Sequence, residues 1–333
     1  MPRPRTGRVA EIKKLLIART FDPYHQPGQR FMSNRSIARQ FKISYQTADV
    51  LLRELTSEGR LERRASSGTY IPGRQVKSAG VVMIFHPRAK RKNSFGAKLL
   101  DCLVAALDRE RIDWRMVWTN PADSKRALLV ADRYPVIWER PEVVEKLISL
   151  QRCALLLNQR PPAGVGSTLI DSISVDDFSG GAGAAQFLVA RCPRSAPRFA
   201  ILSGPVSDPR SSARVAGFLS VAQARVVSAP TWFYDDAKTV AANVLKAGPD
   251  GIFCCNDRLA EAAIRSCSIL GMIRPAVVGF DDAPVATWLN LTTVAIPWEE
   301  LVGAASSVIR SRMTGAANSA IAQFVSTRII VRD

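Results

Sequence analysis

Short apolar runs with the length of strands alternate with amphipathic, helix-like stretches over most of the 333-residue chain. Residues 81–85 are apolar throughout, and Leu99, Leu103 and Leu107 then recur at helical spacing. Repetition of this alternation predicts βαβ units and parallel sheets, with room for two sheets in the body of the chain. The further strands that we expect lie at 115–118, 136–138, 154–157, 199–202, 251–255, 276–280 and 328–331.

The net charge of +17 is concentrated near the N-terminus. Residues 1–78 carry 16 Lys and Arg against 6 Asp and Glu, a net charge of +10, whereas the other 255 residues carry only +7. A small basic segment attached to a larger, nearly neutral body predicts a polyanion-binding head, with nucleic acid as the first candidate. The alternative is an ordinary solvated basic face.

The basic segment has the pattern of three short helices followed by a hairpin. Apolar residues at helical spacing predict a first helix over 7–20. Ser33 and Ser44 are good N-caps for a second and a third helix, and Gly59 is typical of a helix end. A turn at 65–68 predicts a β-hairpin, which completes a winged helix-turn-helix. Three short helices also occur without DNA, but the local charge favours DNA.

The residues at the helix starts, helix ends and turns of this segment resemble those of the winged-helix domain of the GntR family of bacterial repressors. The resemblance covers about residues 7–73 and rests on residues 26–28, 33–38, 43–44, 55–59 and 68–70. It implies that Arg35 and the start of the third helix touch DNA, with the wing in the neighbouring minor groove. Gln46 could bind adenine, and Arg53 guanine or phosphate. The candidate DNA-binding residues are Arg35, Ser44, Tyr45, Gln46, Thr47, Arg53, Arg64, Ser67, Gly68 and Thr69.

The segment departs from the family at Tyr45 and Asp49, where arginine is usual, and at Ser66, where glycine is usual. Helical geometry turns Tyr45 and Asp49 away from the core, toward a major groove. Asp49 would repel phosphate and could instead accept a hydrogen bond from a cytosine amino group, so we expect an operator unlike the commonest family sites. Tyr45 has an alternative role as an exposed residue packed on the helix surface.

In the body of the chain, polar residues directly follow three of the predicted strands. Ligands of open parallel sheets lie beyond the carboxyl ends of the strands, so these residues should converge. A cation with amide and carboxylate groups suits a polyhydroxylated ligand, because hydroxyls both donate and accept. Asp257 and Ser211 have a structural alternative as helix caps. The residues concerned are Ser211, Arg214, Asn256, Asp257, Asp281 and Asp282.

Their order and spacing resemble the sugar-binding sensor of LacI-type repressors, which is itself similar to periplasmic binding proteins. The resemblance runs from about residue 79 to residue 333 and rests on 175–181, 214–218, 256–257, 278–282, 291–294 and 328–332. It implies effector contacts by Arg214, Asn256, Asp281, Tyr234, Asp257 and Phe95. The basic loop at 86–92 would fit an anionic effector, but a solvated loop is the simpler interpretation.

We therefore expect an α/β chain with a winged helix-turn-helix at 1–73, a linker at 74–79 and a two-lobed, periplasmic-binding-protein-like sensor with parallel sheets at 80–333. The expected function is a ligand-responsive bacterial transcriptional regulator, a repressor that binds a palindromic double-stranded DNA operator as a homodimer. A small effector, a sugar or sugar derivative, would release it from DNA or retune its binding. The apolar runs are too short to cross a membrane, so the expected location is the cytoplasm.

Two rival functions remain open. A nucleotide-binding α/β enzyme needs a glycine-rich turn after a strand, and the glycines at 180, 181 and 183 do not fit its spacing. Two histidines and six cysteines without a C-x-x-C pair give no catalytic, metal or cofactor site. The second rival is a DNA-binding regulator whose sensor has lost its ligand and serves only for dimerisation; the trio Arg214, Asn256 and Asp281 argues against it.

Overall fold

The computed structural model describes residues 7–20, 28–58, 60–71, 80–92, 94–118, 133–149, 153–161, 170–314 and 320–332. Gly59 and the expected linker lie outside these residues. Contacts divide the chain into an N-terminal unit, Met1–Ser174 with Glu299–Gln323, and a C-terminal unit, Val175–Trp298 with Phe324–Asp333. The chain therefore passes three times from one unit to the other.

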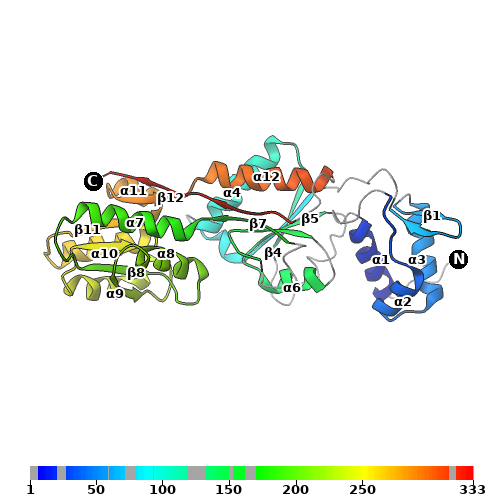
Figure 1. The fold of residues 1–333 in the computed structure, drawn as a ribbon, viewed down its shortest axis with the longest axis horizontal. Coiled ribbons are helices and arrows are strands. Elements are labelled where there is room, and N and C mark those ends of the chain that lie inside the picture. The colour runs from blue at the N-terminus through cyan, green and yellow to red at the C-terminus, as the bar shows by residue number, and fades with distance from the viewer. Residues whose placement is uncertain are drawn as a thin grey trace. The chain divides into compact units, whose positions relative to one another are not determined.

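The described residues between 7 and 71 form three helices and a hairpin around a core of their own, which we call the head (Figure 1). The helices are α1 (Gly7–Thr20), α2 (Asn34–Phe41) and α3 (Tyr45–Ser57). Both expected N-caps are confirmed, because the Ser33 and Ser44 hydroxyls accept hydrogen bonds from backbone N–H groups at 3.1 and 3.0 Å. The fully or nearly buried core consists of Ile12, Leu16, Phe31, Ile37, Ala48, Leu51, Leu52, Leu55, Leu61 and Ile71.

The hairpin of the head pairs β1 (Glu62–Arg64) with β2 (Gly68–Tyr70) in antiparallel register, as the sequence predicts. Its turn contains Ser66 at φ 58° and Gly68 at φ 121°. A positive φ favours glycine, so Ser66 occupies a backbone conformation that glycine would adopt more readily. We call this hairpin the wing.

The N-terminal unit also contains a six-stranded sheet in the order β13-β7-β6-β5-β3-β4. Its described ladders from β7 to β4 are parallel. Helix α6 packs against Val82, Ile84 and Ile137 on one face of the sheet, and α4 and α12 lie on the other (Figure 1). The elements are β3 (Val81–Phe85), η1 (Pro87–Lys90), α4 (Phe95–Arg109), β4 (Trp114–Trp118), β5 (Tyr134–Trp138), α6 (Pro141–Ser149), β6 (Ala154–Leu157), β7 (Ile170–Val175), α12 (Trp298–Thr314) and β13 (Ala322–Val325).

A second six-stranded sheet, in the order β14-β12-β11-β10-β8-β9, forms the C-terminal unit and is parallel except for β14. Helix α7 packs on α8 and α9 on α10, and the two pairs cover opposite faces of the sheet (Figure 1). The elements are α7 (Asp177–Arg191), β8 (Phe199–Ser203), α8 (Pro209–Leu219), β9 (Ala224–Ser228), α9 (Tyr234–Lys246), β10 (Gly251–Cys254), α10 (Asp257–Ile269), β11 (Ala276–Asp281), α11 (Pro284–Trp288), β12 (Thr292–Ala295) and β14 (Arg328–Ile330).

Two glycines bring α7 and α8 into close contact. A Cβ atom at Gly181 would collide with the carbonyl of Arg214, and one at Gly217 would collide with the carbonyl of Phe178. The helix backbones can therefore approach only because these positions have no side chain. This approach carries Arg214, on α8, to the first residue of α7, Asp177.

All the strands expected from the sequence are present, but four others were not predicted: β7, β9, β12 and β13. Edge strands β9 and β13 are largely exposed, so they lack an apolar run. Strand β7 is buried yet contains Asp171 and two serines, and β12 begins with two buried threonines. No helix within the described ranges is long and apolar enough to span a bilayer.

A buried ion pair joins three elements of the N-terminal unit and the residue that precedes β13. Arg312 on α12 donates two hydrogen bonds to the Asp171 carboxylate on β7, at 2.6 and 2.8 Å. Asp171 also accepts from the Tyr134 hydroxyl at 2.6 Å and from the Ile321 N–H at 2.7 Å. Both ionic side chains are at most 1% exposed. The free-energy cost of removing these two charges from water is therefore offset only while all of these hydrogen bonds are formed.

We predict that Asp171→Asn lowers the free energy of unfolding by about 3 kcal/mol, because it leaves the Arg312 charge buried without its counter-ion. Urea denaturation followed by circular dichroism measures the change. The control is Asp235→Asn, which removes an exposed ion pair to Lys238 and should cost less than about 1 kcal/mol. Equal effects of the two substitutions would contradict the assignment.

Candidate functional sites

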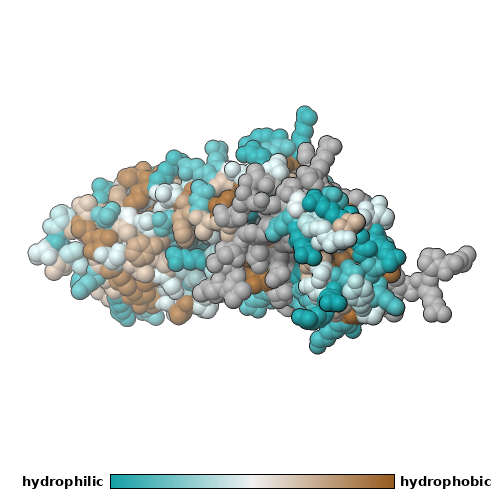
Figure 2. All heavy atoms as spheres, turned by 45° about the vertical axis from the view of Figure 1, so that its right-hand side comes forward, coloured by the Kyte–Doolittle hydropathy of each residue, from teal (hydrophilic) through white to brown (hydrophobic). Residues whose placement is uncertain are grey.

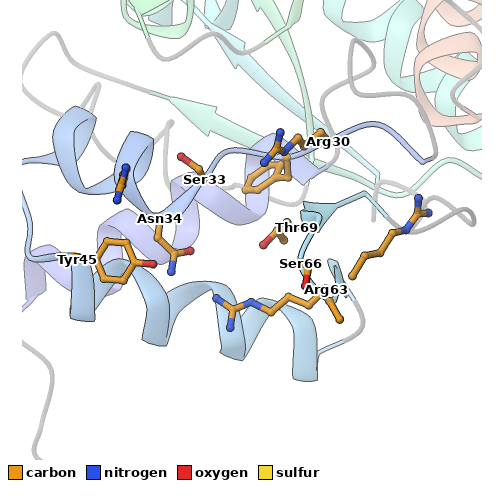
Figure 3. A pocket seen from close by; sticks show the side chains of 12 residues that line it. Arg30, Ser33, Asn34, Tyr45, Arg63, Ser66 and Thr69 are labelled. Atoms are coloured by element: carbon orange, nitrogen blue, oxygen red, sulfur yellow. The ribbon is translucent and has the colours of Figure 1, made fainter.

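A groove of about 550 Å³ opens in the head between the starts of α2 and α3 and the wing (Figure 3). Four arginines line it: Arg30, Arg35, Arg63 and Arg64. None of the twelve described residues that line the groove is acidic. Such a surface attracts a polyanion, and its position beside the exposed start of a helix suits the backbone of a nucleic acid.

The residues predicted to bind DNA lie around this groove or on the outer face of α3. Tyr45 is 55% exposed and lines the groove together with Arg35. Ser44 caps α3, its hydroxyl lying 2.8 Å from that of Thr47. Gln46 is exposed, and so is Arg53, whose side chain is 70% exposed. The outer face of α3 is thus polar and open, as its helical period predicts.

On the wing, the predicted residues differ in what they can offer to DNA. Arg64 is exposed, and its guanidinium lies 4.4 Å from the centroid of the Tyr70 ring. The Ser67 hydroxyl lies 2.5 Å from that of Tyr70. Thr69 is buried, and its carbonyl accepts a hydrogen bond from the Phe31 N–H at 2.8 Å. Gly68 lines the groove.

Sequence reasoning missed Arg30. Its backbone forms a β-bridge with Tyr70, and its guanidinium lies close to Gly68, 3.1 Å from where a Cβ atom would stand. Arg30 therefore adds a fourth cation to the groove. Residues 28–33 have neither a helical nor a strand period, so only the local charge could have drawn attention to them.

Asp49 is not left free on the outer face of α3. Its Oδ1 atom accepts hydrogen bonds from Asn34 at 2.8 Å and from Arg63 at 2.5 Å, and its Oδ2 atom accepts one from Arg53. The hydrogen bond from Arg63 is the largest cause that lowers the pKa of Asp49, to about 2. The carboxylate on this face is thus already occupied by donors of the protein.

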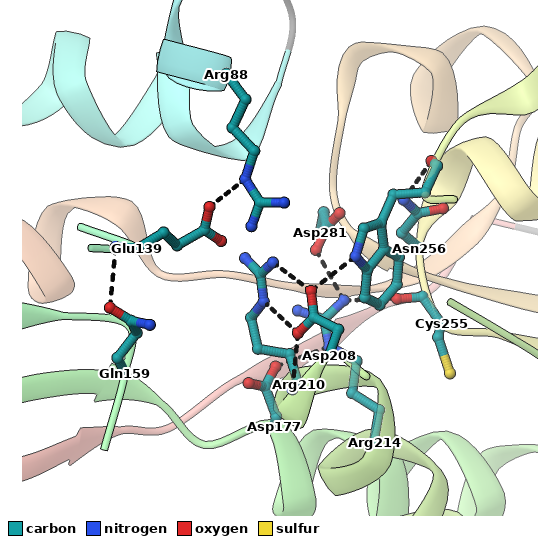
Figure 4. A network of polar contacts seen from close by, with 11 residues as sticks. Arg88, Glu139, Gln159, Asp177, Asp208, Arg210, Arg214, Cys255, Asn256 and Asp281 are labelled. Atoms are coloured by element: carbon teal, nitrogen blue, oxygen red, sulfur yellow. Dashed lines mark hydrogen bonds and ion pairs between the residues drawn. The ribbon is translucent and has the colours of Figure 1, made fainter. Parts of the chain in front are cut away.

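In the C-terminal unit, Arg214 lies at the centre of a second cluster and is only 2% exposed (Figure 4). Its guanidinium donates to Asp177 at 2.7 Å, to Asp281 at 3.1 Å and to the carbonyl of Cys255 at 2.5 Å. The Phe280 ring lies beneath it, with its centroid 3.6 Å from the guanidinium carbon. Burial alone would lower the pKa of Arg214, but the charges of the two carboxylates raise it.

The backbone is strained where it presents Asp281. Asp281 has φ 104° and Asp282 φ 54°, both in the left-handed region. Strain of this kind persists only where the surroundings enforce it, and it is common at ligand sites. Here Arg214 holds the side chain of Asp281, while Arg332 donates to Asp282 at 2.7 Å. Burial raises the pKa of Asp281 above its ordinary value.

Trp232 supplies an aromatic surface that the sequence analysis did not identify. Its indole N–H donates to Asp208 at 2.9 Å, and its carbonyl accepts from the Asn256 amide at 3.0 Å. The ring lies against Gly204, where an added Cβ atom would stand 2.6 Å from it. The Arg214 guanidinium is 5.7 Å from the ring centroid. A tryptophan on a segment with no regular period gives no sequence signal of this role.

Asp208 closes the same cluster at the start of α8. Its carboxylate accepts two bonds from the Arg210 guanidinium, at 3.0 and 2.6 Å, and caps α8 through the Arg210 N–H (Figure 4). Burial opposes the ionisation of Asp208, but the hydrogen bonds and the charge of Arg210 outweigh it and hold the pKa below its ordinary value. Each arginine of the cluster is therefore paired with carboxylate.

The Tyr234 and Asp257 side chains, both predicted to bind an effector, contact residues other than Arg214. The Tyr234 ring contacts Lys238 and Arg265, with the Lys238 ammonium 4.6 Å from its centroid. Asp257 is buried and accepts from Thr293 and from the Ala283 N–H, both at 2.6 Å. Burial raises the pKa of Asp257 well above its ordinary value. Phe95 belongs to the N-terminal unit. Effector roles for these three residues stay predictions.

In the N-terminal unit, Phe95 stacks on Trp138 with centroids 6.4 Å apart. Two cations of the neighbouring basic loop are engaged within the unit. Arg88 forms an ion pair with Glu139 (Figure 4), and the Lys90 ammonium lies 4.6 Å from the centroid of the Trp118 ring. Glu139 in turn donates its N–H to the side chain of Gln159 at 2.9 Å.

The C-terminal cluster as a whole offers hydrogen-bonding groups rather than reactive ones. Two arginines, at 210 and 214, face three carboxylates, at 177, 208 and 281, and Trp232 and Phe280 add apolar rings. Among the described residues, no group of His, Cys, Asp and Glu could hold a metal ion. This arrangement suits a small ligand that both donates and accepts hydrogen bonds.

Comparison with known proteins gives one family match. Residues 193–333 match the model of a periplasmic binding protein-like domain. A comparison with curated proteins finds no match.

Several solved structures are similar in fold. The transcriptional regulator CelR in complex with cellobiose is 18% identical, with a TM-score of 0.65 over 89% of this chain and 94% of that chain. A LacI family transcriptional regulator from Enterococcus faecium with bound ribose is 18% identical, with a TM-score of 0.62 over 75% of this chain and 97% of that chain.

A sugar-binding transcriptional regulator of the LacI family from Escherichia coli, complexed with phosphate, is also 18% identical. Its TM-score is 0.62 over 77% of this chain and 98% of that chain. At identities this low, the TM-scores show a similar fold and nothing about a shared function. Residues 193–333 are thus similar to a periplasmic binding protein-like domain, and the three structures with a similar fold are those of transcriptional regulators, two of them of the LacI family.

Proposed function

We propose that the protein is a ligand-responsive transcriptional regulator that binds double-stranded DNA through the head and a small effector through the Arg214 cluster. The observation that carries the proposal is the arginine-lined groove beside α3, in a chain whose other part has the fold of sugar-binding regulators. Neither feature alone would separate a regulator from a binding protein. The fold supports a regulator over an enzyme, and the cytoplasm is the compartment where such a protein would meet DNA.

The head binds DNA, on this proposal, as a winged helix of GntR type. Helix α3 presents Gln46 and Arg53 to a major groove, and the wing presents Arg64 to the adjacent minor groove or its phosphates. Arg30 and Arg35 contact the sugar-phosphate backbone that lies between the major groove and the minor groove. The support is geometric, since the groove that these arginines line separates α3 from the wing.

The effector is a neutral, polyhydroxylated molecule such as a sugar. Both arginines of the C-terminal cluster are already paired with carboxylates, and the three carboxylates outnumber them. An anionic ligand would therefore meet a net negative surface, whereas hydroxyls can both donate to Asp281 and accept from an arginine N–H. Trp232 would pack on the apolar face of a sugar ring.

We further propose a homodimer that represses transcription from a palindromic operator. Figure 2 shows apolar residues gathered over the C-terminal unit, and Ile269, Ile273 and Trp288 are among its most exposed side chains, Trp288 at 82%. A two-fold dimer would match the symmetry of a palindrome. An effector that binds one conformation better than another would then shift the occupancy of DNA.

We predict that Arg35→Ala weakens DNA binding and makes the salt dependence about one unit less steep, since one phosphate contact is lost. Fluorescence anisotropy with duplexes from the gene's own upstream region, at several salt concentrations, measures both quantities. Arg109→Ala removes the same charge from the exposed face of α4 and is the control. Unchanged affinity of the Arg35 variant at moderate salt would rule out this docking of the head.

We predict that Asp281→Asn abolishes effector binding and leaves DNA affinity intact. The substitution keeps the size of the side chain but removes the charge that orients Arg214 and accepts from a hydroxyl. A thermal-shift screen of the wild type against neutral sugars and sugar phosphates identifies the ligand; saturation at 100 times Kd stabilises by about 2.7 kcal/mol. Asp236→Asn, on the exposed side of α9, should keep the response. If the sensor serves only for dimerisation, no compound in the screen should raise the melting temperature of the protein.

A further inference from the structure

One carboxylate connects all three elements of the head that face the groove. Asp49 belongs to α3, and its donors come from α2 (Asn34), from the next turn of α3 (Arg53) and from the first strand of the wing (Arg63). Its side chain is 15% exposed. Asp49 and Arg63 lie 14 residues apart in the chain, so their bond is a tertiary contact between helix and wing.

The wing depends on such contacts for its position. Each of its strands has three residues, and β1 is exposed along its whole length. A two-stranded hairpin of this size has little stability alone. The described contacts that hold it to the rest of the head include the β-bridge between Arg30 and Tyr70 and the ion pair between Asp49 and Arg63. The ion pair ties the wing directly to α3.

Three of the roughly four acceptor positions of the carboxylate are already used within the head, so it has little left to offer a base of DNA. Its Oδ1 atom already accepts two hydrogen bonds and its Oδ2 atom one, from an arginine. The two guanidinium groups, by contrast, each use one Nη2 atom on Asp49 and keep further N–H donors. Most of the hydrogen-bonding capacity that remains for DNA at this point therefore belongs to arginines held in place by a carboxylate.

We propose that Asp49 is a positioning residue for sequence selectivity: it holds Arg53 and Arg63 as an oriented pair and fixes the wing against α3, so that these arginines contact guanine edges. The inference rests on the proposed DNA-binding function. An oriented guanidinium presents two N–H groups to the O6 and N7 atoms of guanine, whereas a free one contacts any phosphate. Asp49 also cancels part of the positive charge that drives binding to every sequence, which widens the difference between operator and non-operator DNA.

The test compares the full-length wild type with Asp49→Asn. Asparagine has the same shape and can still accept from Asn34, but it carries no charge to hold the two arginines. Selection from a random library of double-stranded oligonucleotides first defines the sequence that the wild type prefers. Anisotropy titrations with that duplex and with a scrambled duplex, over a series of salt concentrations, then give the selectivity ratio and the salt slope for each protein.

We expect Asp49→Asn to reduce the selectivity ratio at least tenfold, because binding to the scrambled duplex strengthens while the preferred duplex loses its oriented contacts. The salt slope should steepen by about one to two units, as one or two released arginines move to phosphates. Melting followed by circular dichroism should show a folded head. Glu11→Gln, which removes the same charge from the exposed face of α1, should leave the ratio unchanged.

A double-mutant cycle with Arg63→Gln tests whether Asp49 acts through the wing. If it does, Asp49→Asn lowers the selectivity ratio much less in the Arg63→Gln background than in the wild type. Additive effects would overturn this part of the proposal.

Two other outcomes would overturn the proposal in different ways. If Asp49→Asn strengthens binding to both duplexes equally, Asp49 forms only a surface ion pair. If the variant selects a new base at one position where the wild type selects cytosine, and keeps the rest of the sequence, Asp49 contacts that base directly. A folded wild type that enriches no sequence at all would instead contradict the proposed function, and this inference with it.

Discussion

The contact between α7 and α8 determines what the C-terminal unit can bind. Gly181 and Gly217 let the two helix backbones approach, and this approach places the Arg214 guanidinium against Asp177. A buried guanidinium without a counter-ion would cost several kcal/mol, so the position of Arg214 fixes the positions of its carboxylate partners as well. Asp281, one of these partners, has a strained backbone at φ 104° and accepts a hydrogen bond from Arg214 at 3.1 Å.

Both candidate sites use carboxylates to hold arginines. In the C-terminal cluster the pairs are buried and balance the charge, so the surface is polar without attracting anions. In the head, Asp49 holds two arginines, while the groove beside it is lined by cations without a carboxylate among its described residues. The difference in charge matches the proposed ligands, a neutral molecule for the first site and a polyanion for the second.

Much of this fold could be predicted from helix caps and from the spacing of apolar residues in the sequence. The head was predicted closely because Ser33 and Ser44 cap its helices and its apolar residues keep a helical period. Strands β7 and β12 were missed because buried polar residues interrupt their apolar pattern: Asp171 is satisfied by Arg312 from a distant helix, and Thr293 by Asp257. Such partners are visible only in three dimensions.

The same limit applies to the sites. The sequence analysis grouped Arg214 and Asp281 among the polar residues that follow predicted strands, and the structure brings them together. It gave no reason to choose Trp232 over Tyr234, since both stand on one short segment and only the fold turns Trp232 toward Asp208. The sequence analysis did not identify Arg30 or the hydrogen bonds of Asp49, because both depend on how the wing folds back on α3.

We propose that occupation of the Arg214 cluster changes how the head binds DNA. The most direct measurement is a DNA titration of the full-length protein with its own upstream region, repeated in the presence of each compound from a panel of neutral sugars and sugar phosphates. The account predicts that at least one neutral sugar changes the apparent Kd for DNA by about fivefold or more, and that sugar phosphates do not. A Kd that no compound changes, or a change caused only by anionic compounds, would contradict it.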